Sequence, residues 1–140
     1  FFTSNFLIEK IIFESVLFEE KLTQYGREDF LFSLDLIKKK FTIKHLSNEV
    51  YHLGLDENTL FVSKTKKAME NLIFIDDNHL ITEEELPILK LVGKVSKIKM
   101  TRIVSKLYPY FEKRSIKSSS VFFLNCMKVS YLCHLKLTHE

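Results

Sequence analysis

The sequence is short of glycine and cysteine, and each shortage limits what the chain can be. Because it has 3 Gly in 140 residues, no glycine-rich loop of the kind that cradles phosphate groups is present. Its 2 Cys are too few for the disulfide framework of a small secreted domain. Two cysteines without such a framework favour a reducing, intracellular location.

Long hydrophobic runs are also missing. Runs such as Val121–Leu124 are four residues long, whereas a transmembrane helix needs roughly 20 apolar residues. The first residues lack the basic region and the small-residue cleavage site of a signal peptide. We therefore expect a cytoplasmic protein with no membrane partner.

What the chain does contain is enough apolar material for one core. It has 46% hydrophobic residues, among them 13 Phe and no Trp, and 28% charged residues, as ordinary globular domains do. A chain of this length buries roughly 68% of its unfolded surface, so it needs no metal ion or disulfide to fold. The sequence therefore predicts a single domain, residues 1–140.

Charge is divided unevenly along the chain. Residues 1–85 carry 10 Lys or Arg and 16 Asp or Glu, whereas residues 86–140 carry 11 and 2. The overall charge of +3 thus hides an acidic half and a strongly basic half. A basic half favours an anionic partner, by long-range attraction and by release of counterions.

Apolar spacing of three and four residues predicts a mainly α-helical fold. Capping residues and helix-dipole charges help to place the ends of these helices. The predicted helices span residues 4–25 (ended by Gly26), 28–39, 42–53, 56–72 (beginning at Asp56 or Asn58), 83–95, 100–107 and 112–127.

Short β-structure is predicted at two places. The runs 73–75 and 79–81 flank the polar turn 76–78, which is typical of a small hairpin. Val129, Tyr131, Cys133, Leu135 and Leu137 alternate with period two, which predicts a strand.

A shift of 57 residues aligns part of the chain with itself. It places Glu28 on Glu85, Lys40 on Lys97 and Tyr51 on Tyr108. One interpretation is an internal repeat of residues 28–81 and 85–137. The competing interpretation is chance, because any two amphipathic helices of similar length can be aligned in this way.

Metal and catalytic sites find little support. Glu49 and His52 form one Glu-x-x-His element, but a di-iron bundle requires two. Cys126 and Cys133 are too far apart for a usual zinc pair, even with His134 and His139 nearby. Nothing matches the Gly-x-Ser-x-Gly pattern of a serine hydrolase. We expect no enzyme activity, no metal site and no cofactor.

The basic segment from residue 97 to 118 is the most informative part of the sequence. It contains one acidic residue, Glu112, and its cations are interleaved with Tyr108, Tyr110 and Phe111. If two helices meet at Tyr108-Pro109, the segment has the order of a helix-turn-helix, whose second helix enters the major groove of DNA. The alternative is a solvated basic helix face. The predicted nucleic-acid-binding residues are Lys97, Lys99, Arg102, Lys106, Lys113, Arg114, Lys117 and Ser118.

From Thr82 onward the apolar pattern resembles that of MarR/SarA-type winged-helix transcription regulators. The residues that carry the resemblance are Thr82–Leu86 with Ile88-Leu89, Met100 with Ile103 and Leu107, Ile116 through Leu124, and Tyr131-Leu132. The resemblance implies one or two helix-turn-helix or winged-helix units and a wing that begins at Tyr131.

Together these features predict a DNA-binding transcriptional regulator of winged-helix type, with double-stranded DNA as its partner. The alternative function is an all-helical protein–protein interaction module without catalytic activity. In both cases the helix expected at residues 4–25 would bind a protein partner or a second copy of the chain.

Overall fold

In the computed structural model, residues 5–22, 25–51, 53–82 and 86–138 are described. Every regular element in these ranges is an α-helix. Their bounds are α1 Lys10–Ser15, α2 Glu28–Lys38, α3 Asn58–Asp77, α4 Pro87–Lys97, α5 Thr101–Lys106, α6 Tyr108–Ser118 and α7 Val121–Thr138.

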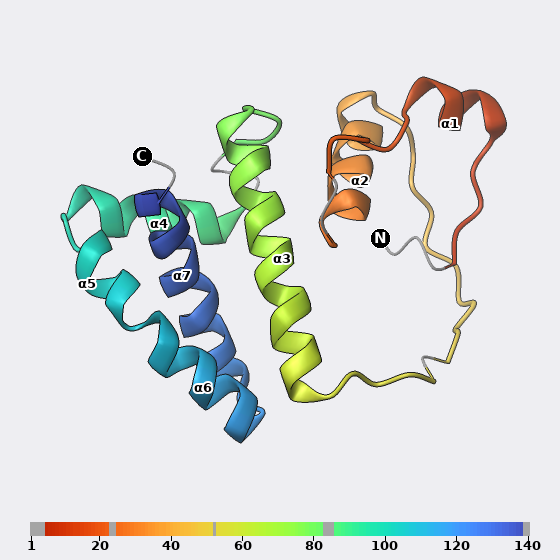
Figure 1. Cartoon of the computed structure of the whole chain (residues 1–140). Helices are drawn as coiled ribbons and strands as arrows, with labels where there is room; N and C mark the ends of the chain where they lie inside the picture. The colour runs from red at the N-terminus through yellow and green to blue at the C-terminus, as the bar shows by residue number, and fades with distance from the viewer. Residues whose placement is uncertain (1–4, 23–24, 52, 83–85, 139–140) are drawn as a thin grey trace.

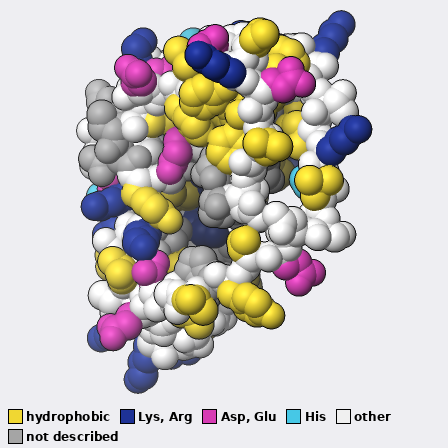
Figure 2. Space-filling view, turned by 90° about the vertical axis from the view of Figure 1, so that its right-hand side faces the viewer, with side chains coloured by type: hydrophobic (Ala, Val, Ile, Leu, Met, Phe, Trp, Pro, Cys, Tyr) yellow, Lys and Arg dark blue, Asp and Glu magenta, His cyan; other side chains and the backbone are white. Residues whose placement is uncertain are grey.

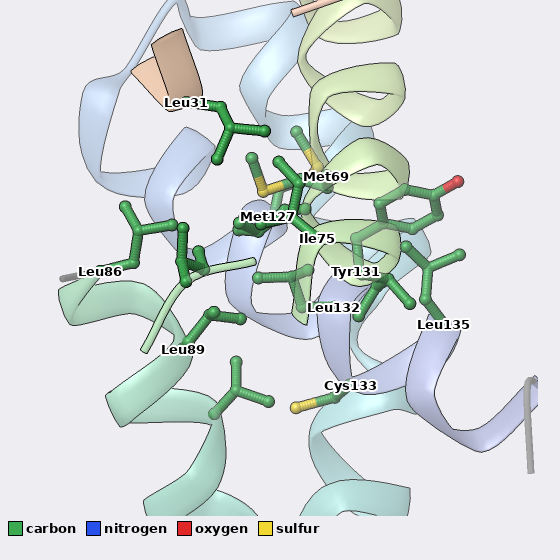
Figure 3. Close-up of a cluster of buried hydrophobic side chains, with 14 of the residues drawn as sticks. Leu31, Met69, Ile75, Leu86, Leu89, Met127, Tyr131, Leu132, Cys133 and Leu135 are labelled. Carbon is green, nitrogen blue, oxygen red and sulfur yellow. The ribbon is translucent and has the colours of Figure 1, made fainter. Parts of the chain in front are cut away.

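Helix α7 is the centre of the main body. Helices α3, α4, α5 and α6 all pack against it, and α1 and α2 lie on the other side of α3 (Figure 1). Met127 and Leu132 of α7 are completely buried, with Met69 and Ile75 of α3 and Leu89 of α4 around them (Figure 3). The mainly α prediction is therefore confirmed.

The strand predicted near the C-terminus is wrong, and so is the wing. Val129–Leu137 lies inside α7. Because α7 is surrounded by four helices, Leu132 is as deeply buried as its neighbours Tyr131 and Cys133. A helix that is buried nearly all round is apolar on every side, so its sequence no longer shows polar residues at the 3.6-residue helical period. The period-two alternation of apolar residues in this segment therefore does not indicate a strand. Residues 129–137 therefore do not form the β-wing that a winged-helix fold requires.

The hairpin predicted at residues 73–81 is also wrong. Residues 73–75 form the last turns of α3, with Ile73 and Ile75 buried. The chain leaves the helix through His79 (φ 54°) and returns to the core with Ile81. A short apolar run does not by itself distinguish a strand from a buried helical turn.

The helix predicted at residues 4–25 is reduced to α1. Three rings converge on Phe32 of α2: Phe6 at 6.3 Å, Phe13 at 6.0 Å and Phe18 at 4.4 Å between ring centroids. Phe13 and Phe18 would point about 140° apart on one helix. The irregular backbone around α1 brings both rings to Phe32, which with Val16 and Leu36 forms a second, smaller core.

Residues 42–51 and 53 are irregular rather than helical, and all of them except the partly buried Ile43 are exposed. A short helix is marginal in water unless an apolar face packs, and Leu46, Val50 and Leu53 are 78%, 61% and 94% exposed. The predicted helix at 42–53 is therefore wrong where the structure describes it. Helix α2 agrees with the prediction. Helix α3 begins at Asn58, one of the two expected starts, and extends to Asp77, beyond the predicted end at residue 72. The internal repeat stays a prediction.

The helix predicted at residues 83–95 would include residues 83–85, which lie outside the described residues, and α4 itself begins at Pro87. The helix predicted at 112–127 is two helices. Helix α6 ends at Ser118, Ser119 has φ 49°, and α7 starts at Val121. Asn58 of α3 donates to the Ile116 carbonyl at 2.9 Å and to the Ser119 hydroxyl at 2.8 Å. The Ile116 carbonyl thereby gains a hydrogen-bond donor at the C-terminal end of α6, where helix carbonyls have no partner within the helix.

Candidate nucleic-acid interface

Helices α5 and α6 follow one another almost without interruption. Leu107, the residue between them, has right-handed helical dihedrals (φ −83°, ψ −11°), so the helical phase continues from one to the other. The Phe111 amide donates to the Leu107 carbonyl at 3.1 Å. The Tyr108-Pro109 pair expected to form a turn is therefore the first turn of α6, and the helix-turn-helix order is not present at this point.

The inner side of α5 and α6 packs on α7. Ser105 and Ser115 are buried, and Tyr108 and Phe111 are half-buried. The Tyr108 ring lies 4.9 Å from the Tyr131 ring, centroid to centroid. This packing fixes the rotation of both helices, and thereby which residues face outward.

The outer side of the same helices is cationic. Arg102, Lys106, Tyr110, Lys113 and Lys117 are all exposed. At 100° per residue they lie within about 40° of one line, and the line extends for about 22 Å along the helical axis. Lys99, exposed in the turn before α5, precedes this line. We call Lys99, Arg102, Lys106, Lys113 and Lys117 the basic face.

The remaining predicted site residues, Lys97, Arg114 and Ser118, do not lie on the line of the basic face. Lys97 is exposed in the last turn of α4. Arg114 is exposed, and its guanidinium carbon lies 4.9 Å from the centroid of the Phe123 ring, a cation–π distance. Ser118 donates its hydroxyl to the Arg114 carbonyl at 2.7 Å. All eight predicted residues are thus at the surface; four of them share one face of α5 and α6, and Lys99 lies in the turn before it.

The acidic residue of this region is turned away from the basic face. Glu112 accepts a hydrogen bond from Lys66 of α3 at 2.9 Å. Desolvation lowers the pKa of Lys66, but hydrogen bonds to Tyr108 and Glu112 outweigh it and raise the pKa overall. In the described residues, the salt bridges of the structure include none from the basic face.

The candidate metal ligands that the structure describes do not form a metal site. Cys126 and Cys133 are free thiols on α7, and Glu49 lies in the irregular segment before α3. His52 and His139 lie outside the described residues. Among the residues described, no three His, Cys, Asp or Glu side chains are grouped so as to hold a metal ion.

Sequence reasoning missed a second cationic site. A cavity of about 410 Å³ lies between α3, α7 and the segments before α2 and α3, and Arg27 and Lys128 are among its lining residues. These two residues belong to parts of the sequence with opposite net charge, so no local pattern connects them. Only tertiary packing brings them together.

Comparison of the chain with protein-family models, with curated proteins and with solved structures finds no match to any of them. Within the described part of the chain, no helix has the length and apolar content needed to cross a membrane.

Proposed function

We propose that the chain binds double-stranded DNA through the phosphate backbone, using the basic face of α5 and α6. The observation that carries the proposal is the common outward direction of four exposed cations on α5 and α6, with Lys99 exposed in the turn before them. The neighbouring acid, Glu112, forms a salt bridge with Lys66. Lys and Arg contacts to phosphate supply most non-specific affinity, and they do not require a wing.

The proposal is limited to backbone contacts. The line of cations on α5 and α6 is about 22 Å long. It is shorter than one turn of B-DNA, which is about 34 Å long. Phosphate contacts position a protein on the duplex but read no sequence. The expected binding is therefore non-specific, with a dissociation constant of about 1–100 μM at physiological salt.

The test is a fluorescence-anisotropy titration of a labelled duplex at several salt concentrations. Five phosphate contacts predict a slope of about −4.5 for log K against log salt concentration. The variant Lys106→Glu/Lys113→Glu should weaken binding strongly and reduce the magnitude of the slope by about 2. The control Lys44→Glu/Lys67→Glu makes the same change in net charge at two exposed positions outside the basic face.

Two results would contradict the proposal. One is equal weakening by both double variants, which would mean that net charge alone attracts the duplex. The other is a single-strand preference that disappears in Tyr110→Ala, because aromatic stacking on bases contributes about 1–3 kcal/mol per base to single-strand binding. Duplex binding through phosphates predicts less than about a twofold effect of Tyr110→Ala.

A second candidate function is self-association through the N-terminal part of the chain. Leu7, Tyr51, Leu53 and Leu55 are each more than 90% exposed. Hydrophobic side chains are spread over the side of the molecule that carries α1 and α2 (Figure 2). Burial of such exposed side chains on association is favourable, and we propose a second copy of the chain as the partner.

Light scattering after size exclusion tests this candidate. We expect a dimer whose dissociation is favoured by Leu53→Ser/Leu55→Ser, because both side chains would be buried on association. Ile98→Ser, at an exposed apolar position after α4, is the control. A chain that stays monomeric up to millimolar concentration would contradict self-association.

A further inference from the structure

The cavity of about 410 Å³ beside α3 has two chemically different sides. Its apolar lining includes Leu55, Phe61, Ala68 and Met69, and its charged lining includes three cations, Arg27, Lys64 and Lys128, against one carboxylate, Asp56. Ligand pockets of known proteins have volumes of about 300–1,000 Å³ and combine an apolar wall with a few polar groups. The cavity fits that description.

One of the three cations already has partners. Lys64 donates to both oxygens of Asp56, at 3.0 and 2.8 Å, and its ammonium lies 5.3 Å from the centroid of the Tyr25 ring. The Asp56 carboxylate is therefore used by Lys64. Arg27 and Lys128 therefore have no carboxylate of the cavity lining with which to form an ion pair.

Arg27 is held in an unusual position. Its Nε is buried and has no hydrogen-bond partner, although a buried donor of this kind is costly when unpaired. Its backbone has φ 82°, a left-handed conformation that is rare for a residue with a side chain. Desolvation lowers the pKa of Arg27, and the charge of Asp29 offsets part of this effect.

Lys128 approaches the same cavity from α7. Desolvation lowers its pKa, and the positive charge of Arg27 lowers it further. Two partly desolvated cations that repel each other are destabilising. An anion placed between them would remove the repulsion.

From this geometry we propose that the cavity binds a small organic anion. Its carboxylate or phosphate head group would contact Arg27 and Lys128, and its apolar body would lie against Leu55, Phe61 and Met69. The planar guanidinium of arginine suits either head group. This site is separate from the basic face, since none of its lining residues belongs to α5 or α6.

Isothermal titration calorimetry with phenyl phosphate and with benzoate tests the site. Binding of either probe supports the proposal, and the tighter of the two identifies the preferred head group. Inorganic phosphate should bind at least about tenfold more weakly than phenyl phosphate, because it has no apolar body to bury. Benzyl alcohol, which has the ring but no charge, should also bind more weakly.

Three substitutions to glutamine assign the contacts. Arg27→Gln and Lys128→Gln should each weaken binding of the better probe by at least about tenfold, as expected for loss of a charged hydrogen bond. Lys67→Gln, at an exposed position of α3 outside the cavity lining, should change it less than twofold. Lys128→Gln should also raise the melting temperature of the ligand-free protein, because the repulsion with Arg27 is removed.

The probe experiments distinguish failure of the cavity site from failure of DNA binding. Lys106→Glu/Lys113→Glu should bind the probe as the unaltered protein does, even if it has lost DNA binding. The proposal is overturned if neither probe binds at millimolar concentration, if inorganic phosphate binds as tightly as phenyl phosphate, or if Arg27→Gln and Lys128→Gln bind the better probe unchanged.

Discussion

The ammonium of Lys66 on α3 and the carboxylate of Glu112 on α6 lie 2.9 Å apart. The same ammonium is 5.2 Å from the ring centroids of both Tyr108 and Tyr131. Each partner is about one-quarter exposed, so the pair belongs to the interface of α3, α6 and α7. It joins the helices, and it also removes a negative charge from the neighbourhood of the basic face.

We expect Glu112→Gln to lower the free energy of unfolding by about 1–2 kcal/mol, between the values for surface and for buried ion pairs. DNA binding of the folded variant should be unchanged or slightly tighter, since a negative charge is removed near the cations. Urea unfolding and the anisotropy titration measure the two effects. A clear loss of DNA affinity in a folded variant would show that Glu112 supports the basic face in another way.

The shortage of glycine has a structural consequence at helix ends. Helices α2, α3 and α4 are followed by Lys40, His79 and Lys99, with φ of 62°, 54° and 58°. At each end, the next amide donates to a carbonyl five residues earlier, as the Leu80 amide does to the Ile75 carbonyl at 3.0 Å. This is the pattern of the Schellman motif, in which glycine is the usual residue at the left-handed position.

His79→Gly should therefore raise the free energy of unfolding by about 0.5–1 kcal/mol, since a residue with a Cβ is strained in the left-handed region. His45→Gly, in the exposed irregular segment before α3, is the control. It should have no stabilising effect, because there glycine only increases the freedom of the unfolded chain. Thermal unfolding measures both variants, and an equal response would contradict the assignment.

Gly26 has the opposite role, because the chain needs glycine at this position. Its φ is 95°, and a Cβ added to it would lie 2.9 Å from the Cβ of Ala68 on α3. Its carbonyl also accepts a hydrogen bond from Asn71 at 2.6 Å. We expect Gly26→Ala to lower the free energy of unfolding by about 1–3 kcal/mol.

A compensating change makes this prediction specific. Ala68→Gly removes the Cβ that would collide, and in the Gly26→Ala background it should recover the part of the loss caused by collision. The strain from φ 95° should remain. A double-mutant cycle measured by urea unfolding separates the two parts, and the absence of coupling would contradict the close approach of α3.

The Tyr131 hydroxyl donates to Glu70 at 2.6 Å. Burial raises the pKa of Tyr131 well above its usual value, and the hydrogen bond and negative charge of Glu70 raise it further. The folded state therefore retains this proton at a pH at which the unfolded chain loses it. By linkage, the stability that depends on this proton is complete below about pH 10, the pKa of an unfolded tyrosine, and is lost as pH rises above it.

Tyr131→Phe should consequently reduce the fall in stability above about pH 10. Below pH 9 the variant should be less stable than the unaltered protein, because the hydrogen bond to Glu70 is missing. Urea unfolding at several pH values measures the difference, with Tyr110→Phe on the exposed side of α6 as the control. Parallel curves for all three proteins would contradict a perturbed Tyr131.

The sequence alone determined the helical class, the acidic and basic halves, and the position of α2. It also identified the exposed cations between Lys97 and Lys117, since charge and helix periodicity are local properties. It did not determine the C-terminal part of α7, from Val129 onward, because a helical segment that is buried nearly all round has no polar stripe that would distinguish it from a strand.

Only the tertiary structure decided which side chains meet. Phe6, Phe13 and Phe18 gather around Phe32 by giving up a regular helix, since packing of rings outweighs the weak preference of a short helix. In the same way, Arg27 and Lys128 share a cavity although they are far apart in the sequence. Such meetings depend on the summed packing of the whole chain, and no window of residues contains that information.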